Sequence, residues 1–155
     1  MERVKDQPSR GPLGTLGSML AGGGQALIVQ AQSLADDVQR RIADVWAEEG
    51  IAPHAERHLG LRDNFSFGEV APATIADMIR AVAAEGADAV VILCTNLDGA
   101  ALAASLEQEL DIAVLDSVAV TLWRSLSLAG GDIAALAQWG RIFQTPAMMK
   151  RRRYQ

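Results

Sequence analysis

The sequence predicts an α/β fold, a three-layer sandwich in which helices cover both faces of a four-stranded parallel sheet. Two observations indicate this class. Apolar runs of four to seven residues alternate with amphipathic segments of ten or more, a pattern typical of strands joined by crossover helices. Some runs are also apolar throughout, as expected for strands that are buried on both faces of a parallel sheet.

The first half of the chain predicts two strands and two helices. A strand is expected from Gln25 to Gln30, where four consecutive residues are apolar. A helix capped by Ser33 follows and ends at Gly50. A weaker strand is expected from Ile51 to His58, and a loop from Gly60 to Val70. The second helix begins at Pro72, a residue suited to the first turn, and ends at Gly86.

The second half repeats this alternation. Strands are expected from Asp88 to Leu93 and from Ile112 to Leu115, and helices from Asp98 to Leu110 and from Val118 to Ala129. Right-handed crossovers between parallel strands place all carboxyl ends of the strands at one edge of the sheet. Ligands of such sheets bind at this edge, so the segments that follow the strands are the candidate site.

Length and composition predict one folded domain with two different ends. The 155 residues suit a single domain of ordinary size, expected over residues 25–145. Residues 1–24, rich in glycine, serine and proline, are expected to be flexible or to depend on a partner. Residues 146–155 form a basic tail.

The charge distribution argues against nucleic-acid binding. The stretch from Gln25 to Met149 holds 7 of the 14 basic residues and 17 of the 19 acidic ones, and this field repels a polyanion. The charged start resembles no signal peptide, and no segment is apolar enough to span a membrane. We therefore expect a cytoplasmic protein with no membrane partner.

Metal binding is not expected. A single cysteine cannot build a cysteine-rich metal site or an internal disulfide framework. His54 and His58 are four residues apart, but they lie in a segment predicted to be extended, where helical metal-ligand spacing does not apply.

The only cysteine, Cys94, stands at the end of the apolar strand that begins after Ala87. A thiol at this position would be favoured as the thiolate by the dipole of the following helix and by the amides of Thr95, Asn96 and Leu97. The alternative is that Cys94 is a small core residue, which is the common role of a cysteine after a buried strand.

Four motifs together resemble the aspartate/glutamate racemase superfamily, in particular the branch of maleate cis-trans isomerase and arylmalonate decarboxylase. They are Leu-Gly-Leu-Arg-Asp-Asn-Phe-Ser-Phe (59–67), Cys-Thr-Asn-Leu (94–97), Val-Leu-Asp-Ser-Val-Ala-Val-Thr-Leu-Trp-Arg (114–124) and Trp-Gly-Arg-Ile-Phe (139–143). The resemblance covers roughly Met19 to Phe143. Members of this superfamily are built from two similar α/β domains with the active site between them, and the isomerases and racemases use one cysteine from each domain.

The resemblance implies that this chain corresponds to the second half of that two-domain fold. Cys94 would be the catalytic acid, base or nucleophile, and no cofactor would be needed. The ligand would be a small carboxylate such as maleate, held by Thr95 and Asn96, with Gln32, Asn64 and Ser117 as further substrate-binding residues. Asn64 also suits a turn, and Asp116 and Ser117 also suit a helix cap, so these interpretations stay open.

Two departures from the family pattern affect the expected activity. Asn96 stands where glutamate and aspartate racemases usually have histidine, which favours the isomerase and decarboxylase side. Gln30-Ala31-Gln32 stands where the isomerase branch typically has Thr-Pro-Tyr. Because the first domain has no counterpart here, the alternative is a catalytically silent half-domain that serves binding or self-association.

A partner is therefore expected, either a second copy of the chain or a chain that supplies the first domain. The contact would use an apolar ending expected to remain exposed, which consists of Val118, Val120, Leu122, Trp123, Leu126, Trp139, Ile142 and Phe143.

Overall fold

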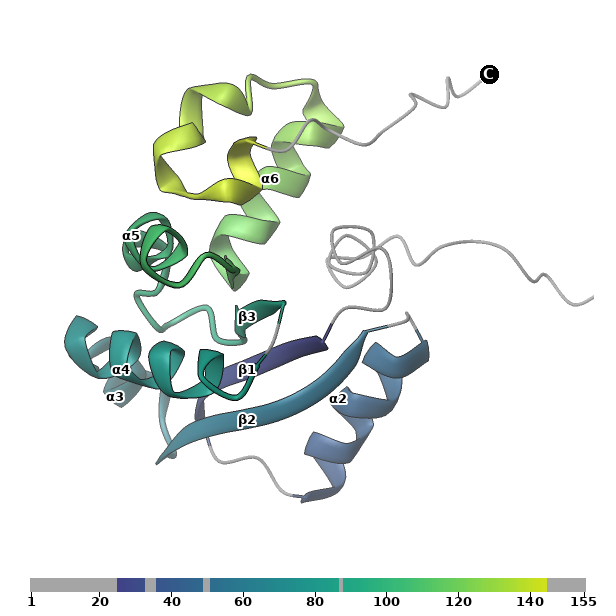
Figure 1. The fold of residues 1–155 in the computed structure, drawn as a ribbon, viewed down its shortest axis with the longest axis vertical. Coiled ribbons are helices and arrows are strands. Elements are labelled where there is room, and N and C mark those ends of the chain that lie inside the picture. The colour runs from purple at the N-terminus through teal and green to yellow at the C-terminus, as the bar shows by residue number, and fades with distance from the viewer. Residues whose placement is uncertain (1–24, 33–35, 49–50, 87, 145–155) are drawn as a thin grey trace, which may run out of the picture.

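The computed structural model describes residues 25–32, 36–48, 51–86 and 88–144 (Figure 1). Strands and helices alternate along this part of the chain, and two short 3-10 helices, η1 and η2, follow the last α-helix. In order they are β1 (Gln25–Gln32), α2 (Asp36–Glu48), β2 (Ala52–Leu61), α3 (Asn64–Gly68), α4 (Pro72–Ala83), β3 (Ala89–Ile92), α5 (Ala100–Leu110), β4 (Ala113–Asp116), α6 (Ser117–Ala129), η1 (Ala134–Trp139) and η2 (Arg141–Gln144). The expected flexible start, 1–24, and the basic tail, 146–155, lie outside the described residues.

The strands pair in parallel in the order β2-β1-β3-β4. This confirms the predicted α/β class and the parallel sheet. The chain adds β2 on one side of β1 and then returns to add β3 and β4 on the other side. The crevice between the carboxyl ends of β1 and β3 is therefore the point where the strand order reverses, which is where open α/β sheets bind their ligands.

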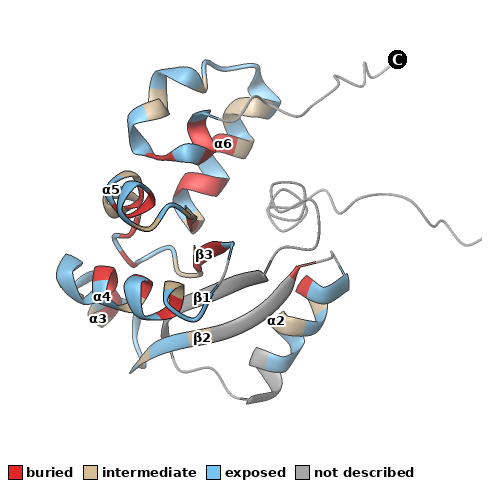
Figure 2. Ribbon diagram, in the orientation of Figure 1, coloured by how far each residue is buried: buried red, intermediate tan, exposed pale blue. Residues whose placement is uncertain are grey.

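Two apolar clusters pack on the sheet, and successive residues of β3 contribute to different clusters because side chains alternate along a strand. Val90 and Ile92 belong to the first cluster, together with residues of α3, α4 and α5. Val91 belongs to the second, together with Trp46 of α2 and residues of α6 and η2. Figure 2 shows the buried residues on the inner sides of α4, α5 and α6.

The apolar ending is only partly exposed, which corrects the expectation for this segment. Val120, Trp123, Ile142 and Phe143 are buried and form part of the second cluster. Exposure was expected because this ending faces the first domain in the family resembled, but η2, which carries Ile142 and Phe143, packs against α6 and β4 instead. Val118, Leu122 and Trp139 do remain exposed.

A buried carboxylate holds η2 in this position. Glu107 of α5 is 2 % exposed and accepts hydrogen bonds from the backbone N–H of Val114, at 3.0 Å, and of Arg141, at 2.6 Å. The guanidinium of Arg141 in turn donates to the carbonyl oxygen of Glu107 at 3.0 Å and to Asp111 at 2.7 Å. One acidic side chain therefore joins α5, β4 and η2.

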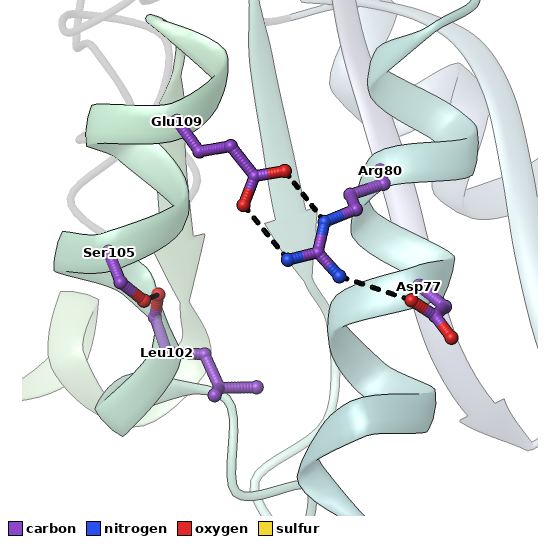
Figure 3. Close-up of polar contacts among 5 residues, drawn as sticks. All are labelled: Asp77, Arg80, Leu102, Ser105 and Glu109. Atoms are coloured by element: carbon purple, nitrogen blue, oxygen red, sulfur yellow. Dashed lines mark hydrogen bonds and ion pairs between the residues drawn. The ribbon is translucent and has the colours of Figure 1, made fainter.

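An exposed ion pair joins α4 to α5 (Figure 3). Arg80 donates from Nε to Oε1 of Glu109 at 2.7 Å and from Nη2 to Oε2 at 2.9 Å, and its Nη1 donates to Asp77 at 3.1 Å. The hydrogen bond from Arg80 lowers the pKa of Glu109 below its ordinary value. This two-pronged contact orients the two helices that cover the first cluster.

The segment predicted as a loop from Gly60 to Val70 contains the end of β2 and the short helix α3. Asp63 has an extended backbone and caps α3, accepting from the backbone N–H of Ser66 at 2.9 Å and from its hydroxyl at 2.7 Å. These bonds lower the pKa of Asp63. The cap brings Asn64 and Phe65 to the carboxyl edge of the sheet.

In the part of the chain that the structure describes, no helix is both long and apolar enough to cross a membrane.

Candidate functional site

The carboxyl ends of β1, β3 and β4 lie side by side. Ile92, the last residue of β3, is in register with Val29 of β1 on one side and with Asp116 of β4 on the other. Cys94 follows β3 after a single residue, and Gln32 is the last residue of β1. Cys94 therefore lies just beyond the carboxyl end of a strand, as the sequence predicted, and the strand order places it beside the crevice where that order reverses.

The surroundings of Cys94 are compatible both with a reactive thiol and with a small core residue. Its side chain is half-buried and packs against the first apolar cluster, as a core residue would. Helix α5 begins at Ala100 and not at Asp98, so five residues separate Cys94 from the start of the helix. The N-terminus of α5 is therefore more distant from the thiol along the chain than the sequence predicted.

The two residues after Cys94 are exposed, and one of them contacts α3. The side-chain amide of Asn96 donates a hydrogen bond to the backbone carbonyl of Asn64 at 3.0 Å. This bond fixes the loop after β3 against α3. It brings together three of the predicted substrate-binding residues, Thr95, Asn96 and Asn64.

Ser117, the first residue of α6, is tied to the neighbouring strand. Its hydroxyl donates to the carbonyl oxygen of Ile92 at 2.7 Å. The bond satisfies a backbone acceptor at the end of β3, beyond which the sheet pairing stops. In this arrangement the hydroxyl has a structural partner next to the site.

Asp116 caps α6, which was one of the two roles that the sequence suggested for it. Its Oδ1 accepts from the backbone N–H of Val118 at 2.8 Å and of Ala119 at 3.1 Å. Its Oδ2 is buried and has no hydrogen-bond partner among the described residues. Burial raises the pKa of Asp116, with a smaller contribution from the charge of Asp98, while the two cap bonds act in the opposite direction.

An open cleft of about 740 Å³ lies between α3, the loop after β3 and the N-terminus of α6. Its lining combines polar and apolar side chains: Asn64, Phe65, Gly68, Glu69, Thr95, Asn96, Leu97, Asp98, Ala100, Asp116 and Val118. Three of the predicted site residues thus line the cleft. Cys94 and Ser117 are not among the described lining residues, and Gln32 is described by its backbone alone.

The lining is acidic. It includes Glu69, Asp98 and Asp116, whereas no described lining residue is basic. The N-terminus of α5 partly compensates, because Gly99 provides no side-chain cap and leaves the first backbone N–H groups of the helix available at Ala100. Backbone and side-chain amides are therefore the groups at this cleft that suit an anionic ligand.

Two residues of the cleft, Phe65 and Asp98, were not predicted as site residues from the sequence. Phe65, which is 78 % exposed, lay inside the first family motif but was assigned no role. Asp98 was expected inside a helix. Among the described residues, no group of three or more histidine, cysteine, aspartate or glutamate side chains is arranged to hold a metal ion.

A parallel α/β domain with an open cleft beside the carboxyl ends of its strands defines the general class of this protein. The family model described as Asp/Glu/Hydantoin racemase matches residues 18–124. The chain belongs to this family, as its motifs indicated.

Individual members of the family are similar to this chain over most of its length. The chain is 32 % identical over 138 residues to arylmalonate decarboxylase from Bordetella bronchiseptica, and the match covers 85 % of this chain and 58 % of the relative. A crystal structure of arylmalonate decarboxylase aligns with a TM-score of 0.68 at 29 % identity, covering 84 % of this chain and 57 % of that one. A maleate cis-trans isomerase from Nocardia farcinica, with a covalently bound succinylcysteine intermediate, has the same fold, with a TM-score of 0.72 at 18 % identity over 85 % of this chain and 54 % of that one. The chain thus spans somewhat more than half the length of these relatives.

Proposed function

We propose that this chain is one half of a cofactor-independent enzyme of the isomerase, racemase or decarboxylase type that acts on small dicarboxylates. The observation that carries the proposal is its similarity to arylmalonate decarboxylase, combined with the position of its single thiol beside the ligand crevice of the sheet. The name of that relative identifies a malonate derivative, which is a small dicarboxylate. Assays with maleate and with substituted malonates would show which of these two kinds of dicarboxylate is the substrate.

Cys94 is the proposed reacting residue. Racemisation removes a proton from the carbon next to a carboxylate and returns one, whereas decarboxylation breaks the bond to CO₂ and delivers a proton to that carbon; a thiolate can take the proton and a thiol can give it on its side of the substrate. Isomerisation of maleate would instead use the thiolate as a nucleophile that adds to the double bond and later leaves. All three reactions develop negative charge on the carboxylate, so they need hydrogen-bond donors there more than they need a cofactor.

Thr95 and Asn96 are the proposed carboxylate donors, because both line the cleft and follow Cys94 directly. Asn64 fixes this loop through the bond from Asn96. Gln32 and Ser117 are proposed to complete the site from β1 and α6, at the same edge of the sheet.

The proposed complete enzyme contains a second, similar domain that covers the open side of the cleft. In this proposal, residues 25–145 form a three-layer sandwich that is one half of the fold, and the second domain comes from a partner chain or another copy. The length of the relatives supports this, as does the apolar surface next to the cleft formed by Phe65, Val118 and Leu122. We call these three residues the cleft patch.

The second candidate function is a catalytically silent half-domain that binds a ligand or a partner. It is favoured by the packing of Cys94 against the core and by the absence of Cys94 from the described lining of the cleft. In that case the family fold would be retained without the chemistry of its thiol.

Proton-NMR assays separate the two functions. The chain is incubated with maleate, phenylmalonate or methylmalonate, in D₂O for the last of these. Production of fumarate from maleate, of phenylacetate from phenylmalonate with loss of CO₂, and exchange of the acidic C–H of methylmalonate for deuterium report the three kinds of chemistry. The proposal expects activity in at least one assay, and its loss in both Cys94→Ser and Cys94→Ala, since the chain has no other thiol.

Loss of activity in the Cys94 variants is informative only if the variants are folded. Circular dichroism should show that both variants keep the fold of the native chain. Full activity of Cys94→Ser would refute the assigned role of the thiol. Inactivity of the native chain with all three compounds, alone and with a candidate first-domain chain, would support the silent half-domain.

A further inference from the structure

The two carboxyl oxygens of Asp116 have different surroundings. Oδ1 accepts two backbone hydrogen bonds at the N-terminus of α6, whereas Oδ2 is buried without a partner among the described residues. The residue is 1 % exposed, yet it is part of the cleft lining. Capping of α6 therefore accounts for one oxygen and leaves the other unexplained.

A neutral carboxyl group fits this arrangement better than a charged one. A charged carboxylate would keep negative charge on Oδ2 with no donor and little water, which is costly in a buried position. In the neutral form the proton belongs on Oδ2, because both N–H groups already point at Oδ1. Burial and the neighbouring Asp98 raise the pKa of Asp116, in agreement with this assignment.

The other charges of the cleft determine which form of Asp116 is compatible with a carboxylate ligand. Glu69 and Asp98 already place negative charge at the opening, without a basic residue in the described lining. A third charge from Asp116 would repel a carboxylate ligand further. A neutral Asp116 would instead present an O–H donor to that ligand.

We propose that Asp116 is a ligand-binding residue of the cleft, whose neutral carboxyl group donates a hydrogen bond from Oδ2 to a carboxylate of the ligand. The inference rests on the proposed function, since it assumes that the cleft takes a small carboxylate. It adds a proton-dependent donor to the amides of the cleft. A carboxyl–carboxylate bond of this kind is short and strong, because its acceptor is charged.

Other titratable groups lie at the cleft or on the elements packed next to it. Glu69 and Asp98 line the same cleft, and the elements packed next to it carry Cys94 after β3, Glu107 on α5 and Arg124 on α6. Asp98 is the one whose charge acts on Asp116. Removing that charge should therefore move the ionisation of Asp116 to lower pH without removing the donor.

The test measures binding of phenylacetate to the chain by NMR titration from about pH 6 upward, where this carboxylate stays ionised, until the pH has passed through the pKa of Asp116. Native affinity should fall as pH rises, by roughly tenfold for each pH unit above the pKa of Asp116. Asp116→Asn should bind with an affinity that does not change over this range, because its amide donates at all pH values and its oxygen still caps α6. Asp98→Asn, the matched control, should keep the fall in affinity but move it to lower pH.

Three results would overturn the inference. Identical pH profiles for the native chain and Asp116→Asn would remove the role of Asp116 while leaving a carboxylate cleft. Selective binding of benzylamine that Asp116→Asn abolishes would mean that Asp116 is ionised and recognises a cation. Absence of phenylacetate binding in every variant would contradict the carboxylate cleft itself, and the inference with it. A carbon-13 NMR titration of the Asp116 carboxyl group in the ligand-free chain checks the protonation independently.

Discussion

At the scale of single residues, the pKa of Asp116 couples folding to pH. The folded chain binds the proton of Asp116 more tightly than the unfolded chain does, because burial raises its pKa above the ordinary 3.8. Stability rises with pH only where the unfolded state holds more protons, so here it must fall. The stabilisation is complete below the ordinary pKa and is lost as pH rises through the raised one.

We therefore expect Asp116→Asn to remove a decline in stability that the native chain shows with increasing pH. Urea unfolding at a series of pH values, from about pH 4 upward, measures the free energy of unfolding of both proteins. The lowered pKa values of Asp63 and Glu109 act in the opposite direction and at lower pH, and both proteins share them. Parallel curves for the two proteins would contradict the prediction.

Gly99 illustrates how closely the loop after β3 packs. A Cβ atom at this position would lie 2.3 Å from Cδ1 of Ile92 and 3.1 Å from Oδ2 of Asp116. Ile92 is fully buried and has little room to move. We expect Gly99→Ala to lower the free energy of unfolding by about 1–3 kcal/mol, the usual cost of overpacking.

Gly68→Ala is the matched control for this substitution. Gly68 lies in α3, and nothing is within 4 Å of the Cβ atom it would gain. Alanine should be neutral or slightly stabilising there, because it favours a helix over glycine. Urea unfolding of the two variants compares them, and equal effects would contradict the packing argument.

At the scale of elements, Glu107 is a buried acceptor for two backbone N–H groups from β4 and η2. Glu107→Ala leaves both donors without a partner, and an unsatisfied buried donor costs about 1–3 kcal/mol. We expect a loss of at least that size, together with faster amide hydrogen exchange at Arg141. Glu107→Gln keeps an acceptor oxygen and should lose less, so equal losses would count against this role.

The elements that the sequence predicted best are those with long local signals. Pro72 correctly began a helix, and the apolar run before Cys94 became β3. Helix α3 has only five residues and depends on the cap by Asp63, which is too short a signal for periodicity. No local pattern distinguishes Glu107 from a solvated helix residue, because its partner Arg141 is 34 residues away.

The candidate site was predicted only where it depends on local sequence signals. Strand ends are local features, so Cys94, Thr95 and Asn96 were located at the right edge of the sheet. The bond between Asn96 and α3, the loop conformation before α5 and the unpartnered oxygen of Asp116 depend on contacts between distant segments. No local pattern contains that information.

At the scale of the whole molecule, the cleft patch should support association. Phe65 of α3 and Val118 of α6 line the cleft from two sides, and Leu122 lies one turn further along α6; all three are exposed, and exposed apolar side chains of this kind often bind a partner. We expect self-association of the isolated chain, measured by sedimentation velocity, and weaker association of Leu122→Lys. Leu128→Lys is the matched control, since Leu128 is also an exposed leucine of α6 but lies outside the patch. Equal effects of the two substitutions would contradict the assigned surface.

The two apolar clusters also differ in when they can form as the chain leaves the ribosome. The buried members of the first cluster span only Phe67 to Val114. Those of the second extend from Trp46 to Phe143, beyond the end of the family match at residue 124. The first face of the sheet can thus close while synthesis is still under way, whereas the second waits for η2. A nascent chain that contains Trp123 but not yet η2 would expose Trp123 and Leu115. A chaperone could bind this surface until η2 is synthesised.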